Sequence, residues 1–289
     1  MTVATRDPSL RYRRREQTLM LLLASPTLAV ILALVVLPVG WLMVQSFYDG
    51  GFTFEHYRRI LNEDIYWRSF AQTFRISVIV TALALVLGYP VAYAAAMARR
   101  PWDLLILAFV VLPFWTSVLV RAYAWLVLLQ RTGVVNQTLG GLGLIAEPLA
   151  LIHNEFGTIV ATVHILLPFM VIPLYSVMQK IPRDLMQAGA SLGGGPIYLF
   201  FRIFLPLSLP GIIAGATLVF VLCLGFYITP ELLGGGKVTM VSLVVTRNVE
   251  LYNQWGAASA VGVVLLVAVF AIFMIAGRVV PLDRMLGQK

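Results

Sequence analysis

Long apolar runs alternate with short polar segments along the whole chain. A run of about 20 apolar residues is long enough to cross the hydrocarbon core of a bilayer as a helix. The bilayer offers no water to unpaired backbone groups, so each such run is predicted to be helical. The expected spans are residues 19–47, 70–97, 104–129, 156–178, 210–233 and 256–277. The pattern therefore predicts an all-α integral membrane protein with six transmembrane helices.

The segments on the opposite side of the membrane from the termini carry weaker patterns. Residues 55–61, followed by Trp67, are predicted to form a short surface helix that leads into the second span. Residues 238–252 are predicted to form an amphipathic or re-entrant element before the sixth span. The connection 130–155 has no strong periodicity and is expected to be irregular.

A polar stretch between the fourth and fifth spans departs from this pattern. It reads Gln187-Ala188-Gly189-Ala190-Ser191-Leu192-Gly193, and nine further residues lead to Ile203-Phe204-Leu205-Pro206. Gly193 can adopt the backbone conformations that a sharp turn needs. The small residues before it would let a helix seat closely in a groove of a partner. We therefore expect a short helix, a glycine turn and a second segment stopped by proline.

This stretch resembles the EAA loop of the permease subunits of ATP-binding-cassette importers. That pattern is Glu-Ala-Ala, three residues, Gly, nine residues, Ile-x-Leu-Pro. In this chain Gln187 stands in place of the acid, which removes the ionic part of any contact with an arginine, and Gly189 replaces the second alanine. The alternative, a plain turn at residues 193–196, leaves the Ile-x-Leu-Pro tail unexplained. The resemblance implies that the ATP-binding subunit docks on Gln187, Ala188, Gly189, Gly193, Ile203, Leu205 and Pro206.

Four further segments, residues 87–93, 112–123, 164–175 and 226–235, are similar to the permeases of spermidine/putrescine importers. This resemblance covers nearly the whole chain. It implies the type I importer permease fold, with a first helix that embraces a partner, five core helices and a cytoplasmic coupling helix near Gln187. It also implies an ATP-binding subunit dimer, a second and usually paralogous permease subunit, and a periplasmic solute-binding protein. Similar permeases carry opines, phosphonates or other small polar solutes, so these substrates stay open.

The basic residues are distributed unevenly between the two sides of the membrane. A cytoplasmic N-terminus places thirteen basic and five acidic residues inside, a net of +8, which equals the formal net charge of the whole chain. The positive-inside rule therefore predicts a multi-pass protein of the bacterial inner (plasma) membrane with both termini cytoplasmic. The expected layout is a basic tail at 1–18, a transmembrane domain at 19–279 with the coupling loop at about 180–209, and a cytoplasmic tail at 280–289. Basic residues that flank spans contact anionic headgroups of the lipid bilayer, so no nucleic-acid partner is expected.

The sequence contains no recognisable motif for nucleotide binding, catalysis or metal binding. A nucleotide-binding P-loop needs Gly-Lys followed by Ser or Thr, whereas Gly236-Lys237 is followed by Val238. The three histidines, His56, His153 and His164, are scattered, and Cys223 is the one cysteine. We expect no catalytic residues, no metal site and no bound cofactor, with ATP bound and hydrolysed by a partner subunit.

The main alternative class is an autonomous channel or secondary carrier. Such a protein needs coupling acids within its spans, and Glu231 stands nearly alone there. A receptor or scaffold protein is disfavoured by the docking segment. The sequence therefore favours the permease subunit of an ATP-driven, binding-protein-dependent importer, with a polyamine as the expected solute.

A polyamine that crosses the membrane needs carboxylates and aromatic faces along its route, because an unpaired ammonium group in hydrocarbon is costly. Glu231, Tyr227, Trp115 and Tyr123 are the candidate path residues. As alternatives, Glu231 is solvated at the interface or pairs with Arg121 or Lys237, and the aromatic residues belong to the interfacial belt.

Two further polar residues within the spans carry alternative interpretations. Arg121 would repel a polyamine, so we expect a structural role through a carboxylate or helix carbonyls. If Arg121 instead lines the path, an anionic or zwitterionic solute is favoured. His164 is expected to be a packing residue.

Overall fold

The structure is a computed structural model that describes residues 8–279, so the expected tail at 280–289 lies outside the described residues. Within this range the chain is helical, with one isolated bridge between Tyr48 and Phe52. The elements are α1 (Pro8–Gln45), α2 (Glu55–Asn62), α3 (Asp64–Met97), α4 (Trp102–Val111), η1 (Leu112–Trp115), α5 (Val118–Leu129), α6 (Val134–Gly141), α7 (Glu155–Met178), α8 (Arg183–Ser191), α9 (Pro196–Leu199), η2 (Phe200–Phe204), α10 (Leu205–Leu224), α11 (Ile228–Leu233), α12 (Val241–Glu250) and α13 (Trp255–Val279).

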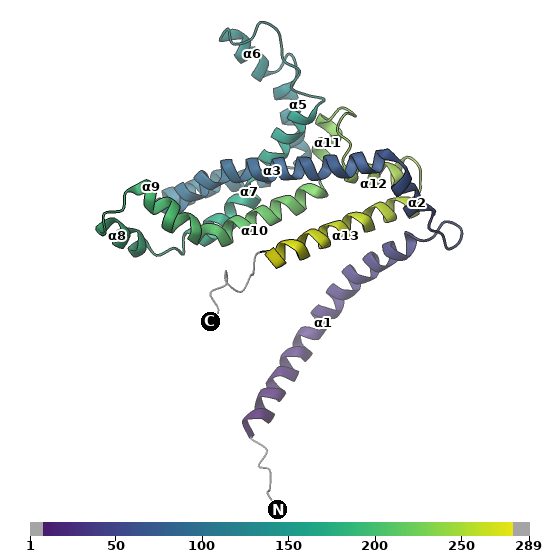
Figure 1. The fold of residues 1–289 in the computed structure, drawn as a ribbon, viewed down its shortest axis with the longest axis horizontal. Helices are drawn as coiled ribbons and strands as arrows, with labels where there is room; N and C mark the ends of the chain where they lie inside the picture. Colours follow the sequence, from purple (N-terminus) through teal and green to yellow (C-terminus); the bar gives the residue numbers. More distant parts are fainter. Residues whose placement is uncertain (1–7, 280–289) are drawn as a thin grey trace, which may run out of the picture.

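Four long helices, α3, α7, α10 and α13, run side by side and form the body of the molecule (Figure 1). The short helices α8 and α9 lie at one end of this body, and α2 and α12 lie at the other. Within residues 8–279, six helical segments are long and apolar enough to cross a membrane: Leu22–Gln45, Asp64–Met97, Val118–Gly141, Glu155–Met178, Pro196–Leu224 and Trp255–Met274. The prediction of six membrane helices is confirmed.

The third span differs from the prediction of one helix over residues 104–129. The chain breaks after η1, where Thr116 is extended at φ −99° and ψ 145°. Ser117 then caps α5, since its hydroxyl accepts a hydrogen bond from the Leu119 amide at 3.3 Å. Pro113, which lacks an amide hydrogen, weakens the helical ladder just before the break. The prediction of one continuous helix was therefore wrong. Helices α5 and α6 project away from the four-helix body (Figure 1).

The fifth span is also shifted from the predicted residues 210–233. The apolar helical stretch runs over Pro196–Leu224, so it includes the segment expected to stop at Pro206. Pro206 lies instead in the first turn of α10, where a missing amide hydrogen costs nothing. The helix ends before Gly225, and residues 228–233 form the separate helix α11.

The shorter elements match the sequence more closely. The expected surface helix at 55–61 is α2, and the amphipathic element at 238–252 contains α12. The connection 130–155, expected to be irregular, contains the two-turn helix α6.

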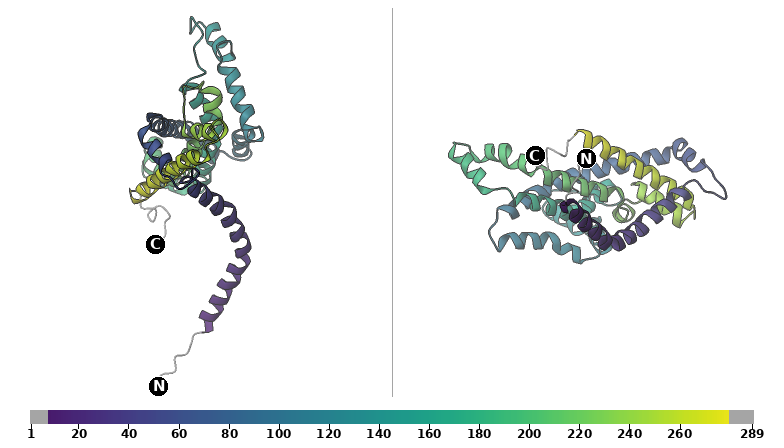
Figure 2. Two further views of the ribbon diagram at one scale, coloured as in Figure 1. Left: turned by 90° about the vertical axis from the view of Figure 1, so that its right-hand side faces the viewer. Right: turned by 90° about the horizontal axis from the view of Figure 1, so that it is seen from below.

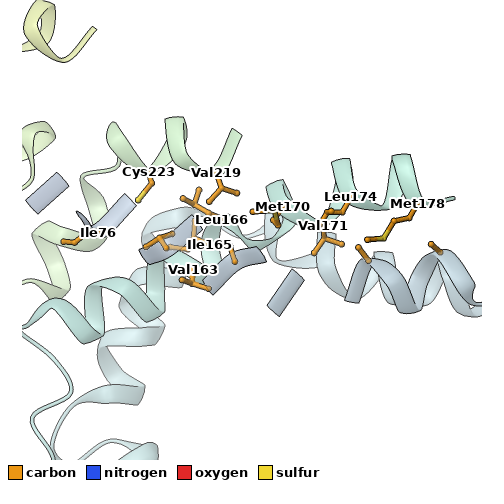
Figure 3. Close-up of a cluster of buried hydrophobic side chains, with 14 of the residues drawn as sticks. Ile76, Val163, Ile165, Leu166, Met170, Val171, Leu174, Met178, Val219 and Cys223 are labelled. Carbon is orange, nitrogen blue, oxygen red and sulfur yellow. The ribbon is translucent and has the colours of Figure 1, made fainter. Parts of the chain in front are cut away.

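The core is formed where α7 lies between α3 and α10. Leu166, Met170, Leu174 and Met178 recur every four residues along α7 and are almost fully buried (Figure 3). Within a bilayer, dispersion contacts between closely packed side chains drive helix association, because lipid is as apolar as the core. The buried face of α7 therefore holds the body together by close fit.

Two glycines allow α10 to approach α7 closely. A Cβ on Gly215 would lie 2.8 Å from Met170 Sδ and 3.1 Å from the Met170 carbonyl oxygen. A Cβ on Gly211, one turn earlier, would lie 3.1 Å from Val177 Cβ and 3.3 Å from the Pro173 carbonyl oxygen. Small residues four apart are a common device for bringing membrane helices into contact. We call this contact the glycine seam.

Hydrogen bonds between side chains connect the helices at several levels. Tyr89 of α3 and Ser208 of α10 are 3.0 Å apart, oxygen to oxygen. At the other end, the Gln72 side chain accepts from the Thr239 amide and donates to Glu155, both at 2.8 Å. Glu155 also pairs with Arg75. These contacts fix the outer ends of α3, α7 and the segment before α12.

Most of α1 extends away from the body, as Figure 1 and the left view of Figure 2 show. It contacts α13 near its end, and its side chains between Leu22 and Val44 are almost all exposed. Pro26 and Pro38 lie inside this helix, and proline bends a helix by removing a hydrogen bond from its ladder. The bowed path of α1 leaves most of this apolar helix uncovered by the other described residues.

The glycine seam predicts that Gly215→Ala weakens the body. The new methyl group would meet the backbone of α7, so we expect a loss of about 1–3 kcal/mol in stability from overpacking. Gly262→Ala is the matched control, because it lies within α13 and a Cβ there meets nothing within 4 Å. Both variants gain the same helix propensity, so the difference between their thermal unfolding curves in detergent isolates the packing cost. Equal curves for the two variants would contradict the role of the seam.

Candidate docking segment and substrate path

The predicted docking stretch begins with α8 and ends in a glycine turn. The Gly193 amide donates to the Ala190 carbonyl at 2.9 Å, and the Gly194 amide donates to the Gly189 carbonyl at 3.0 Å. This pair of bonds is the Schellman arrangement that closes a helix. It requires a left-handed residue, and Gly193 has φ +87°. The short helix and the glycine turn expected from the sequence are both present.

Gly189 faces its own chain. A Cβ at this position would lie 2.5 Å from Leu199 Cδ2 and 3.0 Å from Ile203 Cδ1. Leu199 is buried, with 6% of its surface exposed, although the chain around it is open. The departure from alanine at 189 is therefore explained by packing of α9 and η2 beneath α8. Leu199 is a supporting residue that the sequence analysis missed, and its apolar character between Tyr198 and Phe200 gave no signal that set it apart.

The outer surface of the segment combines small residues with exposed apolar side chains. Gln187, Ala188 and Ala190 are exposed, and no hydrogen bond to the Gln187 side-chain amide is found within residues 8–279. Around them lie five large exposed side chains: Leu185, Leu192, Ile197, Tyr198 and Phe201. Leu192 is 89% exposed in a part of the chain that also carries charge. Large apolar side chains that are exposed along one short segment are typical of a surface that a partner covers. We call this outer surface the α8 face.

The last three predicted docking residues, Ile203, Leu205 and Pro206, lie on η2 and at the start of α10. Ile203 is half-buried against Gly189, and Leu205 is half-buried at the start of α10. Pro206 is exposed in the first turn of α10. A turn of π-helix at Phe200–Phe204 joins the segment directly to the long helix. The part of the α8 face on α9 and η2 is therefore joined to α10 by one helical stretch, Pro196–Leu224, while the glycine turn separates it from α8.

The predicted path residue Glu231 lies in the first turn of α11. Its amide donates to the Tyr227 carbonyl at 3.0 Å, so the two residues share one helical turn. The Glu231 side chain is exposed and makes no ion pair within the described residues, which excludes the alternative pairing with Arg121 or Lys237 in this state. Helix α11 is held by Leu233, which packs with Ala122 and Leu129 of α5.

The three predicted aromatic path residues are all exposed. Trp115, Tyr123 and Tyr227 show 89%, 49% and 47% of their surface. No side-chain hydrogen bond or ring contact joins them to one another or to Glu231 in the part of the chain that the structure describes. One chain therefore presents these groups separately on the surface of α5, η1 and α11. A second surface is needed to enclose them.

Arg121 lies in the first turn of α5 with 8% of its surface exposed. Its Nε and Nη1 atoms are buried and have no hydrogen-bond partner in the described chain. Its guanidinium carbon lies 5.6 Å from the centre of the Phe114 ring. Within residues 8–279 the Arg121 side chain has neither of the expected partners, a carboxylate or a helix carbonyl, and its structural role stays a prediction.

His164 is half-buried in α7 and is held by Trp125. The indole nitrogen of Trp125 donates to His164 Nδ1 at 3.1 Å. This bond agrees with the interpretation of His164 as a packing residue. Within the described residues no three His, Cys, Asp or Glu side chains gather in a way that could hold a metal ion.

Comparisons with known proteins identify the family. Residues 84–282 match the family model described as "Binding-protein-dependent transport system inner membrane component". The chain is 36% identical to the spermidine/putrescine transport system permease protein PotB of Haemophilus influenzae, over 81% of this chain and 83% of that protein. It is 32% identical to PotB of Escherichia coli strain K12, over 84% of this chain and 87% of that protein.

Solved structures show the same fold. The chain resembles a chain of a bacterial ABC transporter involved in the import of the acidic polysaccharide alginate, with a TM-score of 0.71, 20% identity and coverage of 94% and 98% of the two chains. A second structure, a bacterial alginate ABC transporter in complex with an alginate pentasaccharide-bound periplasmic protein, gives a TM-score of 0.73 at 18% identity, over 95% and 97% of the two chains. The fold is that of a type I importer permease, and this chain belongs to the family of binding-protein-dependent transport system inner membrane components.

Proposed function

We propose that this chain is a permease subunit of an ATP-driven, binding-protein-dependent importer of polyamines. The observation that carries the proposal is the similarity over more than four-fifths of the chain to permeases that are named for spermidine and putrescine transport. The exposed and unpaired carboxylate of Glu231, on a helix next to exposed tyrosines, supports a cationic solute.

The α8 face is the proposed docking site for the ATP-binding subunit. Its small residues and exposed apolar side chains suit close contact with a folded partner, and the chain has no P-loop of its own. ATP is then bound and hydrolysed by a dimer of that subunit. A secondary carrier is disfavoured, because the six described membrane segments contain only two acids, Asp64 and Glu155, each at the start of its helix. Asp64 pairs with Arg68 and Glu155 with Arg75, while Glu231 lies on α11 outside these segments.

A second permease subunit is proposed to complete the pathway. The exposed path residues on α5 and α11 and the unpartnered helix α1 are surfaces that another six-helix chain would cover. The α2 and α12 end of the body then faces the periplasm and the solute-binding protein. The α8 end faces the cytoplasm, together with both termini of the chain, as the positive-inside rule requires.

Ala188→Trp tests the docking proposal. Ala188 is exposed, so the fold should tolerate the change, while the larger side chain would hold the partner away from the α8 face. An overpacking cost of about 1–3 kcal/mol corresponds to a roughly five- to hundredfold weaker association with the ATP-binding subunit. The measurement is co-purification of that subunit, together with uptake.

Ala146→Trp is the control for this experiment, because Ala146 is an exposed alanine on the connection between α6 and α7, which lies away from α8. It should leave both assembly and uptake unchanged. Normal assembly and transport in Ala188→Trp would remove the α8 face as the docking site.

Glu231→Gln tests the cationic path. The change keeps the shape and removes the charge, so we expect a loss of about 1–3 kcal/mol of charge-assisted bonding. That corresponds to a roughly five- to hundredfold higher polyamine level for half-maximal effect. The measurement is ATP hydrolysis stimulated by solute-loaded binding protein at saturation, so that the affinity of the binding protein does not mask the effect.

Glu147→Gln, at an exposed acid away from α11, is the matched control and should behave as the wild type. If Glu231→Gln leaves the stimulation unchanged while Arg121→Gln alters it, the solute is contacted by the cationic side chain of Arg121 and not by the carboxylate of Glu231. That result would replace the polyamine with an opine, a phosphonate or another anionic or zwitterionic solute.

Cysteine labelling tests the orientation. In a background with Cys223→Ala, Leu192→Cys places a thiol at a position that is 89% exposed on the α8 face. An impermeant thiol reagent added to intact cells should not label it, whereas Ala146→Cys on the opposite end should react. Labelling of Leu192→Cys from outside would reverse the proposed topology.

A further inference from the structure

Arg121 is the one buried charged side chain within the described residues. Burial of an ion without a counter-charge costs several kcal/mol, even after the protein relaxes. An arginine cannot escape this cost by losing its proton. The ring of Phe114 offers a cation–π contact worth about 0.5–2 kcal/mol, which does not offset the cost. The single chain therefore leaves Arg121 without the partner that its position demands.

No carboxylate within residues 8–279 forms an ion pair with Arg121. Glu155 is held by Arg75 and Gln72. Glu231 lies on α11, which packs against α5, but it is not within 4 Å of any basic group in the described residues. Phe114, which covers the guanidinium, is itself fixed by an edge contact with Phe169 at 5.0 Å between ring centres. Arg121 is thus held in place by aromatic packing with its Nε and Nη1 donors unused.

The surface beside Arg121 is apolar and uncovered. Leu119, Val120 and Tyr123 on α5 are exposed, and Trp115 at the preceding break is more exposed than any of them. Helix α5 leaves the four-helix body at this point (Figure 1). A protein surface that covers these exposed side chains would exclude the remaining water from Arg121 and strengthen any ion pair formed there.

We propose that Arg121 binds a carboxylate of the second permease subunit and so fixes the contact between the two subunits at α5. This inference rests on the proposed function, which supplies the second subunit. A carboxylate of the solute is the other source of the same chemistry, but a polyamine has none and would be repelled by the guanidinium. A subunit, unlike a solute, also stays in place through the transport cycle, as a permanently charged buried group requires.

Arg121→Met tests the inference, because it removes the charge and fills a similar volume. A carboxylate of the second subunit would then be left buried and unpaired, which weakens subunit association by at least about a hundredfold. The chain purified alone should be as stable as the wild type or more stable, since it no longer buries an unpaired cation. The measurements are the amount of second permease, a copy or a paralogue, that co-purifies per tagged chain, and the thermal unfolding of the tagged chain alone.

Two further variants complete the experiment. Leu119→Met changes an exposed neighbour on α5 without touching a charge and should keep normal association. With a paralogous second permease, Glu231→Gln should keep normal association, and a loss equal to that in Arg121→Met would assign the pair to Glu231 of the same chain and overturn the inference. With a copy as the second permease, the same loss would place the pair between Arg121 of one chain and Glu231 of the other and support the inference.

The remaining outcomes also decide the matter. Normal association in Arg121→Met overturns the inference, and a simultaneous change in solute-stimulated ATP hydrolysis would assign the carboxylate to the solute. If Arg121→Met destabilises the tagged chain alone as much as it weakens association with the second permease, Arg121 has its role inside its own chain, and the inference is overturned. A wild-type chain that captures no second permease would overturn the proposed function together with the inference, which separates that failure from the others.

Discussion

The close contact between α7 and α10 is the interaction on which the rest of the structure depends. Without a hydrophobic driving force between helices in lipid, contact distance decides how strongly they associate. Gly211 and Gly215 bring the backbones together, and Met170 and Leu174 fill the space along the seam. Helix α10 continues through η2 into the docking segment at one end and leads to α11 and Glu231 at the other. Both functional regions therefore take their positions from one packed helix pair.

Many polar groups inside the body are paired, but five side chains of the described residues keep a buried polar atom without a partner: His56, Ser77, Asp103, Arg121 and Ser259. Tyr89 pairs with Ser208, Thr162 with Thr229, and Trp125 with His164. Such pairs let membrane helices carry polar atoms at little cost. Arg121 has no such partner although it carries a full charge. Arg121 is the one charged side chain in the buried class among the described residues, and its unpaired guanidinium is the basis for the proposed contact with a second subunit.

Sequence periodicity predicted most of the helices but not where they break. The span at 156–178 was predicted to within one residue, because α7 is apolar throughout and its prolines are accommodated inside the bundle. Hydropathy reports the cost of transfer into lipid and carries no information on backbone continuity, so the breaks at Thr116 and Gly225 were missed. The docking turn was predictable, since Gly193 needs a positive φ angle. The support from Leu199 and the missing partner of Arg121 depend on three-dimensional contacts that no local pattern encodes.

The placement of the two functional regions bears on how ATP hydrolysis can drive transport. In the proposed importer, a signal from the α8 face would reach α10 through a π-helical turn, and such turns are frequent at functional sites. The glycine seam holds α10 close to α7 at Gly211 and Gly215. The outer end of α10 stops at Gly225, where the chain turns into α11. The break after α10 therefore separates α11 from the long helix, so that α11 and Glu231 take their position from α5 and α7.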